Sequence, residues 1–224
     1  MKLAIFDLDN TLLGGDSDHA WGEFLIDEGL VDAETHRARN DAFYRQYQDG
    51  TLKIADYVAF AAEPIAGLNP EHLNTLHDAF MERFIHPLRL PKAMELLDSH
   101  RQSGDKCLII TATNRFITDP IARWLGVEEL IATELETVDG IYTGKMLGTP
   151  CFQQGKVTRL REWLESHHRQ SGAEMLTLDN SVFYSDSFND LPLLEQAGEA
   201  VAVDPDDRLR DIATRRGWRV LSLR

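Results

Sequence analysis

Short apolar runs alternate with longer amphipathic stretches along most of this chain, and no other feature constrains its fold as strongly. Apolar runs this short are typical of buried strands, and the longer stretches have the apolar spacing of helices. We predict strands at residues 2–7, 106–111, 129–133, 181–185, 199–203 and 218–222. Strands separated by helices form a parallel sheet with both faces covered. The sequence therefore predicts an α/β fold with a Rossmann-like, doubly wound parallel sheet.

One interval is too long for a simple connection between two strands. No convincing strand lies between Gly14 and Leu90, and the apolar spacing there predicts helices at residues 17–29, 33–48, 53–66 and 70–85. We therefore predict two domains: a core of residues 1–13 and 87–224, and an all-helical cap of residues 14–86. A cap that begins directly after the first strand can exclude water from a site at that strand's end, whereas a purely structural insert is the alternative.

A second departure from the strand–helix pattern lies between Glu134 and Gly148. The pair Asp139-Gly140 stands between two short segments with strand character, 136–138 and 141–143. Such a pair favours a tight turn between antiparallel strands, so we expect a β-hairpin here.

The first predicted strand ends in two carboxylates. The apolar residues 3–6 lead into Asp7 and Asp9, and Thr11 follows two positions later. On an extended chain these three side chains would lie on one side. Ligands of open α/β sheets bind beyond the carboxyl ends of the strands, and neighbouring carboxylates need a cation or a proton to offset their repulsion. The pattern indicates a metal-dependent site, although the same residues could cap a turn.

Three further segments place polar residues in comparable positions. Thr111 ends the second predicted strand, Lys156 lies at the start of a helix, and Asp186, Asn189 and Asp190 follow the fourth predicted strand. Taken singly, Thr111 could be a turn residue, Lys156 a solvated surface charge, and the acids helix caps. Their order along the chain carries more information than any one of them.

In this order the segments resemble the four motifs of the haloacid dehalogenase-like hydrolases, and the resemblance spans nearly the whole chain. Residues 7–11 and 186–190 correspond to the specific first and fourth motifs, and Thr111 and Lys156 correspond to the weaker second and third. The helical insert matches the C1-type cap of that family, and the most similar branch is the one that contains phosphoserine phosphatases. Within the motifs, Asn10 replaces the more usual Gly or Ser.

The resemblance implies a phosphatase that works through an aspartyl-phosphate. Asp7 would attack the phosphorus, and Asp9 would protonate the leaving alcohol and then activate water. Lys156 would complete the catalytic set by offsetting the charge around Asp7. Lys156 and Thr111 would hold the phosphoryl oxygens, and Asn189 is a further expected phosphate contact.

The resemblance also implies a bound Mg²⁺ ion. The ion would be held by the side chain of Asp7, the backbone carbonyl of Asp9 and the side chain of Asp186, with water and phosphate oxygens completing the octahedron. Asp190 would support this metal site by orienting the ligands.

The cap has to provide the specificity for the alcohol part of the substrate. In phosphoserine phosphatases an acid nine residues after the nucleophile binds the substrate ammonium, and Asp16 stands at that offset, where it could also cap a helix. An ungapped comparison places Ala59 where those enzymes have the arginine that binds the substrate carboxylate, and Arg37, Arg39 or Arg45 could take its place. An ammonium site without a carboxylate site predicts a cationic amino alcohol phosphate.

Histidinol phosphate fits this expectation best. It has an ammonium group and an imidazole but no carboxylate, and the imidazole could stack on Trp21, Phe43 or Tyr44 or meet Asp18. Phosphoserine, phosphocholine and phosphoethanolamine are the alternative substrates. A different class of function, a phosphorylatable binding or signalling module, is disfavoured because Asp9 supplies the acid and base for dephosphorylation.

Composition narrows the expected partners. The chain has 224 residues, of which 43% are hydrophobic, and its formal net charge is −14. Nucleic acids and anionic membranes bind basic patches, so neither is an expected partner. Two cysteines, Cys107 and Cys151, give no disulfide framework, and we find no signal peptide and no bilayer-spanning run. We expect a cytoplasmic enzyme that binds a small-molecule phosphate ester, and the sequence makes no prediction of its oligomeric state.

Overall fold

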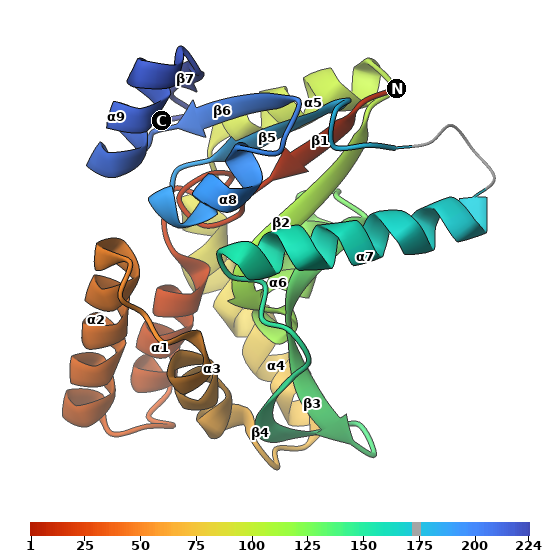
Figure 1. Cartoon of the computed structure of the whole chain (residues 1–224). Helices are drawn as coiled ribbons and strands as arrows, with labels where there is room; N and C mark the ends of the chain where they lie inside the picture. Colours follow the sequence, from red (N-terminus) through yellow and green to blue (C-terminus); the bar gives the residue numbers. More distant parts are fainter. Residues whose placement is uncertain (172–175) are drawn as a thin grey trace.

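The computed structural model describes residues 1–171 and 176–224, and their strands form one sheet (Figure 1). The order in the sheet is β4-β3-β2-β1-β5-β6-β7, and every neighbouring pair is parallel except β3 and β4. The strands are β1 (Leu3–Phe6), β2 (Lys106–Asn114), β3 (Glu129–Val138), β4 (Ile141–Leu147), β5 (Ser181–Ser185), β6 (Glu199–Val203) and β7 (Arg219–Leu221). The predicted α/β fold is confirmed.

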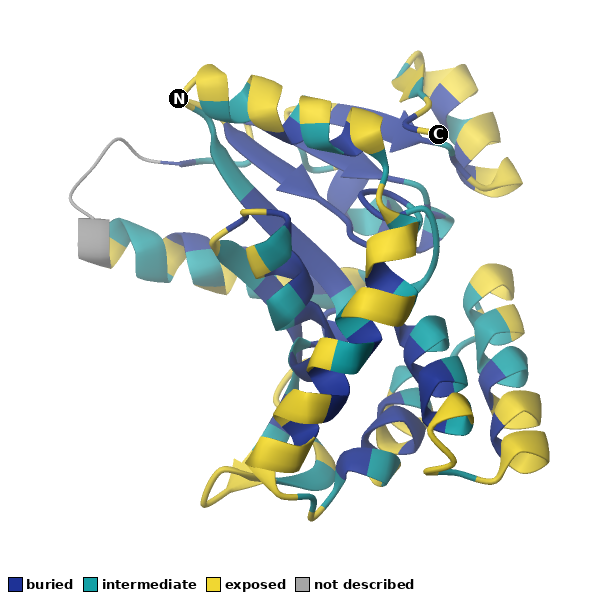
Figure 2. Ribbon diagram, turned by 180° about the vertical axis from the view of Figure 1, so that it is seen from behind, coloured by how far each residue is buried: buried dark blue, intermediate teal, exposed yellow. Residues whose placement is uncertain are grey.

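Both faces of the sheet are covered by helices, which explains why its strands are apolar on both sides. Leu3 and Ile5 of β1 belong to one apolar cluster, and the alternate residues Ala4 and Phe6 belong to another. One face is covered by α5 (Pro91–Gln102) and α6 (Arg115–Trp124), and the other by α7 (Gln154–Ser171), α8 (Leu191–Leu194) and α9 (Asp207–Arg216). Figure 2 shows buried strands between helices with exposed outer faces. The sheet is therefore doubly wound, as predicted.

The interval between β1 and α5 is helical, as expected for the cap. Its helices and turns are α1 (Ser17–Asp27), α2 (Ala33–Asp49), α3 (Ile54–Ala62), η1 (Glu63–Ile65), α4 (Pro70–Phe80), η2 (Met81–Ile85) and η3 (His86–Leu88). The helix predicted at residues 53–66 stops at Ala62, because Pro64 has no N–H with which to continue it. In Figure 1, α1, α2 and α3 lie together below the end of β1. No helix in the described parts of the chain is long and apolar enough to cross a lipid bilayer.

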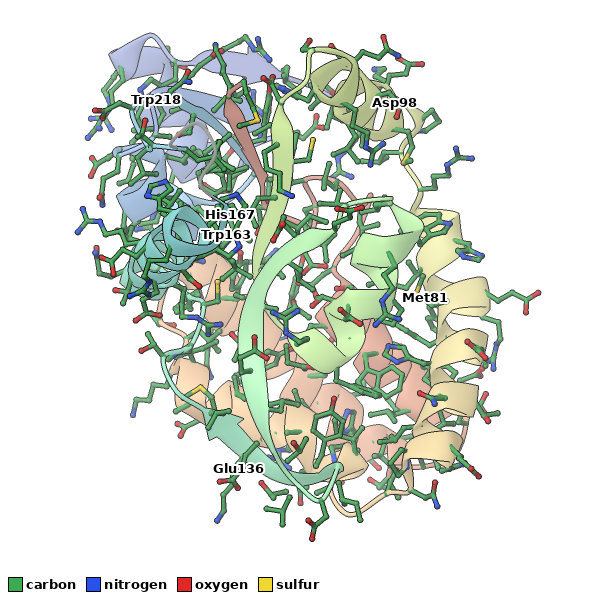
Figure 3. The ribbon with its side chains drawn as sticks, turned by 90° about the vertical axis from the view of Figure 1, so that its right-hand side faces the viewer. Met81, Asp98, Glu136, Trp163, His167 and Trp218 are labelled. Atoms are coloured by element: carbon green, nitrogen blue, oxygen red, sulfur yellow. The ribbon has the colours of Figure 1, made fainter. Side chains whose placement is uncertain are left out.

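The strand β3 is longer than the sequence predicted. The strand expected at residues 129–133 continues to Val138, where Asp139 and Gly140 have positive φ and turn the chain into β4. The hairpin is confirmed, and it extends to the cap, where the Gly67 N–H donates a hydrogen bond of 2.9 Å to the Tyr142 carbonyl. Figure 3 shows Glu136, on this hairpin, at the opposite end of the molecule from Trp218.

Cap and core are also joined by a continuous apolar cluster. Trp21 of α1 packs against Phe24 and Phe80 of the cap and against Phe116 of α6, with ring centroids 5.1, 5.0 and 5.3 Å apart. Aromatic rings of this size bury large apolar areas and favour such edge-to-face contacts. The cluster fixes the first cap helix over the end of the sheet.

Candidate active site

Residues from three distant segments form a buried charge cluster at the carboxyl edge of the sheet. Asp7 follows β1, Lys156 lies in the first turn of α7, and Asp190 ends the turn η4 (Phe188–Asp190) after β5. Lys156 Nζ lies 2.7 Å from Asp7 Oδ1 and 2.7 Å from Asp190 Oδ1. The Lys156 side chain is only 2% exposed, so water screens these ion pairs very little.

The burial of this cluster changes its protonation chemistry. Burial raises the pKa of Asp7 to about 7, although the Lys156 ammonium opposes the change. Burial disfavours the charged form of Lys156 as well, but the carboxylates of Asp190 and Asp7 outweigh this effect and raise the pKa of the lysine. Lys156 is therefore a fixed positive charge, and Asp7 depends on neighbouring cations for its ionised, nucleophilic form.

The side chain of Asp9 is held by two donors. Its Oδ1 accepts a hydrogen bond of 2.6 Å from the Ser17 backbone N–H, and its Oδ2 accepts one of 2.8 Å from the Thr113 hydroxyl. Burial is the main cause that raises the pKa of Asp9 to about 6, and the nearby Asp16 charge adds to it. A carboxyl group with such a pKa can give and take a proton near neutral pH, as a general acid and base must.

The loop after β5 places two more predicted acids. Asp186 Oδ1 accepts a hydrogen bond of 3.2 Å from the Thr11 hydroxyl, and the same hydroxyl accepts one of 3.0 Å from the Asp186 N–H. Asp190 Oδ2 accepts a hydrogen bond of 2.7 Å from the Ser185 hydroxyl, so Ser185 helps to hold the acid that positions Lys156. Asn10 directly follows Asp9 and precedes Thr11. Its φ is 57°, a left-handed conformation that Asn tolerates better than most residues.

Two of the three predicted phosphate contacts, Thr111 and Asn189, lie in different surroundings. Thr111 is buried within β2, just beyond the residues that pair with β1, and lines the cavity that contains Asp7. Asn189 does not line that cavity. Its side chain donates a hydrogen bond of 2.9 Å to the Tyr47 carbonyl and accepts one of 3.1 Å from Gln153, so it joins the core to the cap. One amide N–H and the amide oxygen of Asn189 are used in these contacts, and its contact with a phosphate stays a prediction.

The acids at this edge of the sheet fit a divalent cation held by few carboxylates. In the described part of the chain no group of three or more His, Cys, Asp or Glu side chains is arranged around a common metal position. The expected set needs only two carboxylates, from Asp7 and Asp186, and one backbone carbonyl, from Asp9. After burial, the negative charge of Asp7 is the largest cause that raises the pKa of Asp186 well above its ordinary value. Two buried carboxylates that repel each other in this way fit a cation placed between them.

A cavity lies between these residues and the cap. Its lining is acidic and aromatic, with polar and aliphatic side chains between these groups. The lining residues are Asp7, Asp9, Asp16, Asp18, His19, Asn40, Phe43, Tyr44, Tyr47, Leu52, Ile54, Tyr57, Thr111, Ala112 and Thr113. No lysine or arginine of the described chain belongs to this lining. We refer to it below as the cap cavity.

The three cap arginines that could have bound a carboxylate lie elsewhere. Arg37 forms an ion pair with Glu23, its Nη2 lying 2.9 Å from Glu23 Oε2, on the exposed side of α2. Arg39 stacks over the ring of Phe60 at 4.5 Å, and Arg45 is exposed. None of these guanidinium groups is part of the cap cavity.

Two expectations for the cap are corrected by the structure. Trp21 does not line the cap cavity and cannot stack on a ligand there, because its ring is enclosed by Phe24, Phe80 and Phe116. Ala59 is exposed on α3, so the ungapped comparison did not identify a cavity position. Phe43 and Tyr44, the other aromatic candidates, do line the cavity.

Asp16 and Asp18 lie where the sequence prediction needs them. Asp16 caps α1, since its Oδ1 accepts hydrogen bonds of 3.0 and 2.8 Å from the N–H groups of Asp18 and His19. It also lines the cap cavity, so capping the helix does not exclude a ligand contact, and the ammonium contact stays a prediction. Burial raises the pKa of Asp16 and that of Asp18.

Sequence reasoning missed two residues that contact these acids. Thr113 binds Asp9, and its signal was its place two residues after Thr111 on the same strand, which puts both on one face. Tyr57 hydrogen-bonds to Asp18 and raises no comparable signal, because an aromatic residue in an amphipathic helix is more often a packing residue.

A second, more polar cavity adjoins the first near Asp186. Tyr44 and Tyr47 line both cavities and stand between them. The second cavity also includes Asn10, Ser187 and residues of the loop after β6, among them the exposed Asp206. We refer to it as the side cavity.

Comparisons with known proteins agree with this geometry. Residues 4–195 match the family model described as haloacid dehalogenase-like hydrolase. The chain is 45% identical over 224 residues to a histidinol-phosphatase of Neisseria meningitidis, covering 100% of this chain and 99% of that protein. It is 32% identical over 227 residues to a phosphoserine phosphatase of Mycobacterium tuberculosis, covering 99% of this chain and 70% of that protein.

Solved structures show the same fold. A protein of unknown function from Bordetella pertussis has a TM-score of 0.90 and 42% identity, and the match covers 100% of this chain and 99% of that one. A substrate-bound phosphoserine phosphatase has a TM-score of 0.69 with 17% identity, covering 94% of this chain and 89% of that one. At that identity the second likeness concerns the fold alone.

Proposed function

The chain belongs to the haloacid dehalogenase-like hydrolases and is a phosphatase, and we propose that it is a Mg²⁺-dependent phosphomonoesterase whose substrate is histidinol phosphate. The observation that carries this proposal is the lining of the cap cavity. Asp16 and Asp18 offer two carboxylates there, Phe43 and Tyr57 offer aromatic faces, and no lysine or arginine of the described chain joins them. Histidinol phosphate has an ammonium, an imidazole and no carboxylate. The full-length similarity to a histidinol-phosphatase supports the same substrate.

The charge of the cap cavity is the reason to disfavour phosphoserine. A substrate carboxylate would lie among aspartates with no cation to pair with, and an unpaired buried charge is strongly disfavoured. Phosphoethanolamine and phosphocholine lack that carboxylate, but they also lack a group for the second acid. The relative named as a phosphoserine phosphatase makes phosphoserine the second candidate.

The proposed chemistry assigns one step to each buried acid. Lys156 pairs with Asp7 Oδ1, and the Asp7 carboxylate attacks the phosphorus, forming an aspartyl-phosphate as the bond from phosphorus to the alcohol oxygen breaks. Asp9, with its pKa raised to about 6, donates its proton to the departing alkoxide and afterwards removes a proton from the attacking water. The Thr111 hydroxyl and the Lys156 ammonium hold the phosphoryl oxygens. The place of Asp9 beside Asp7 is also the argument against a long-lived phosphorylated signalling module.

The proposed metal site uses the oxygen donors at the carboxyl edge of the sheet. Asp7 and Asp186 would hold Mg²⁺ with their carboxylates and Asp9 with its backbone carbonyl, while Asp190 orients Lys156 beside them. The ion would supply positive charge to the transferring phosphoryl group. Asp186 and Asp7 would then no longer repel each other.

The proposal is tested by phosphate release from a panel of esters. The purified protein in Mg²⁺ buffer is assayed with histidinol phosphate, phosphoserine, phosphoethanolamine and phosphocholine. We expect kcat/KM for histidinol phosphate to exceed that for phosphoserine by a factor of about 100 or more, because a misplaced charge costs several kcal/mol. A preference for phosphoserine would overturn the substrate assignment.

The metal requirement is tested separately by chelation and by thermal unfolding. EDTA should abolish phosphate release, and excess Mg²⁺ should restore it. Saturating Mg²⁺ should raise the melting temperature of the wild type by stabilising the folded state, whereas Asp186→Asn should show a much smaller increase. Equal melting shifts in both proteins would contradict the ligand assignment of Asp186.

A further inference from the structure

Asp18 is a buried carboxylate with one unused oxygen. Asp18 lies in the first turn of α1, is only 7% exposed, and lines the cap cavity. Its Oδ1 is buried and has no hydrogen-bond partner in the described structure, whereas the carboxylate does meet the Tyr57 hydroxyl. Buried polar atoms are rarely left without a partner, and a carboxylate oxygen requires a donor. Asp18 also lines a smaller cavity beside Trp21, but of the two only the cap cavity contains both Asp18 and Asp7, so a ligand whose phosphate lies at Asp7 can supply this donor.

The surroundings of Asp18 identify the kind of donor that fits. Burial, together with the charge of Asp16, raises the pKa of Asp18 well above its ordinary value, so a positively charged or strongly polar N–H group would relieve the strain on the ionised form. Tyr57 of α3 and Phe43 of α2 line the same cavity and stand edge to face with each other, with ring centroids 5.3 Å apart. Aromatic walls next to an acid suit a flat ring that carries an N–H better than a small, hydrated ammonium.

Asp16 and Asp18 are also distinct in the way they are held. Asp16 is the N-cap residue of α1, where its Oδ1 accepts hydrogen bonds from the helix, and it is partly exposed. Asp18 is buried, and its carboxylate interacts with the Tyr57 hydroxyl. Two acids of different depth suit two separate cationic groups on one ligand. This difference is not expected if a single ammonium is the only group to be recognised.

We propose that Asp18 and Tyr57 form a receptor for an N–H-bearing aromatic ring of the substrate, separate from the group that Asp16 binds. The pair decides between ring-bearing amino alcohol phosphates and small ones such as phosphoethanolamine. The proposal rests on the proposed function in taking the ligand to be an amino alcohol phosphate and its ring to be imidazole.

The test is calorimetric binding of the alcohols themselves, which needs no turnover. Histidinol and ethanolamine share the amino alcohol and differ in the ring, so the ratio of their affinities isolates the ring. We expect the wild type to bind histidinol at least about tenfold more tightly than ethanolamine, since hydrogen bonds to charged groups have this magnitude. Asp18→Asn should reduce that ratio to within about threefold, and Tyr57→Phe should reduce it to a smaller extent.

A matched control removes an equivalent charge outside the cavity. Asp56 is next to Tyr57 in the sequence, is exposed, and does not line the cap cavity. Asp56→Asn should therefore keep the wild-type ratio of histidinol affinity to ethanolamine affinity. Melting temperatures close to that of the wild type show that the variants are folded. The proposal is overturned if Asp18→Asn keeps the wild-type ratio, or if the wild type binds both alcohols equally.

A parallel measurement separates this proposal from the proposed function. If histidinol phosphate is not hydrolysed but histidinol binds with a ratio that depends on Asp18, the assigned substrate is wrong and the receptor stands. If histidinol phosphate is hydrolysed and Asp18→Asn lowers kcat/KM for it and for phosphoethanolamine by the same factor, the substrate stands and the receptor is overturned.

Discussion

Lys156 and Asp7 each stabilise the charged form of the other side chain. The lysine is buried, and its charge is stabilised by carboxylates, while the ionised form of Asp7 is stabilised by that lysine. Asp7→Asn keeps the size of the side chain but removes the nucleophile. We expect phosphate release to fall by roughly a thousandfold or more, as for other essential nucleophiles. The melting temperature should stay within a few degrees of the wild type, and near-normal release would show that another residue attacks the phosphorus.

His77 gives a prediction for stability rather than activity. Burial lowers the pKa of His77 to about 4, and its Nε2 is buried without a partner in the described structure. The folded protein therefore keeps His77 neutral, while the unfolded chain takes up a proton below its ordinary pKa of 6.5. Protonation of His77 in the unfolded chain therefore lowers the free energy of unfolding as the pH falls from 6.5 towards 4. The total loss is about 3 kcal/mol, and there is no loss above pH 6.5.

The comparison with His77→Gln isolates this effect from the other titrating groups. Glutamine does not take up a proton, so only the wild type loses stability in this way. The free energy of unfolding of the wild type minus that of His77→Gln should therefore decrease as the pH falls from 7 to 4. Denaturant unfolding at several pH values measures it. A difference that is constant over this range would mean that His77 titrates alike in the folded and unfolded states.

At the scale of single residues, the sequence predicted the catalytic acids better than the cavity. Asp7 and Asp186 directly follow the buried parallel strands β1 and β5, whose ends meet at one edge, so their proximity follows from the strand prediction. Thr111 lies within β2, beyond the residues that pair with β1. The neighbours of the substrate lie on separate cap helices whose packing angles no local pattern encodes. For that reason the role of Trp21 was predicted wrongly and that of Tyr57 was not predicted.

At the scale of elements, the C-terminal end of α2 is tied to the core. Asn189 donates to the Tyr47 carbonyl, and Arg208 of α9 donates a hydrogen bond of 3.3 Å to the Asp49 carbonyl while stacking on Phe188 at 3.5 Å. A cation also suits the negative end of a helix dipole. These contacts hold α2, which carries three of the cavity's aromatic residues, over the site.

The contribution of this contact is measured with Arg208→Ala. We expect KM for the substrate to rise about fivefold, corresponding to one lost hydrogen bond of roughly 1 kcal/mol, with a smaller change in kcat. Arg215→Ala, an exposed arginine on the same helix that bonds only within its own turn, is the matched control and should leave KM unchanged. The same increase in both variants would point to a general loss of positive charge.

The boundaries of the strands show where the local sequence is sufficient to predict the limits of an element. The strands at residues 181–185 and 199–203 were predicted with their observed limits, because each is a short apolar run inside a parallel sheet. β3 exceeded its prediction because its second half pairs only with β4, so its side chains there are partly exposed and less apolar. Tertiary pairing, rather than composition, sets its end.

At the scale of the whole molecule, one apolar cluster includes residues of the sheet, of α6 and of the cap. Trp21 joins Phe80 of the cap to Phe116 of the core, so neither part can lose its structure without exposing the other. We expect one calorimetric transition for the chain, with equal calorimetric and van't Hoff enthalpies. Trp21→Ala should lower the free energy of unfolding by about 3–5 kcal/mol and keep a single transition. Two separate transitions in the wild type would show that the cap unfolds on its own.

Tyr44 and Tyr47 form a partition between the cap cavity and the side cavity, with Asp7 on one side and Asp186 on the other. Small solutes that reach Asp186 through the side cavity do not have to pass the acidic chamber under the cap. Asp186 therefore borders a polar chamber of its own, set apart by two tyrosine rings from the acidic and aromatic chamber beside Asp7.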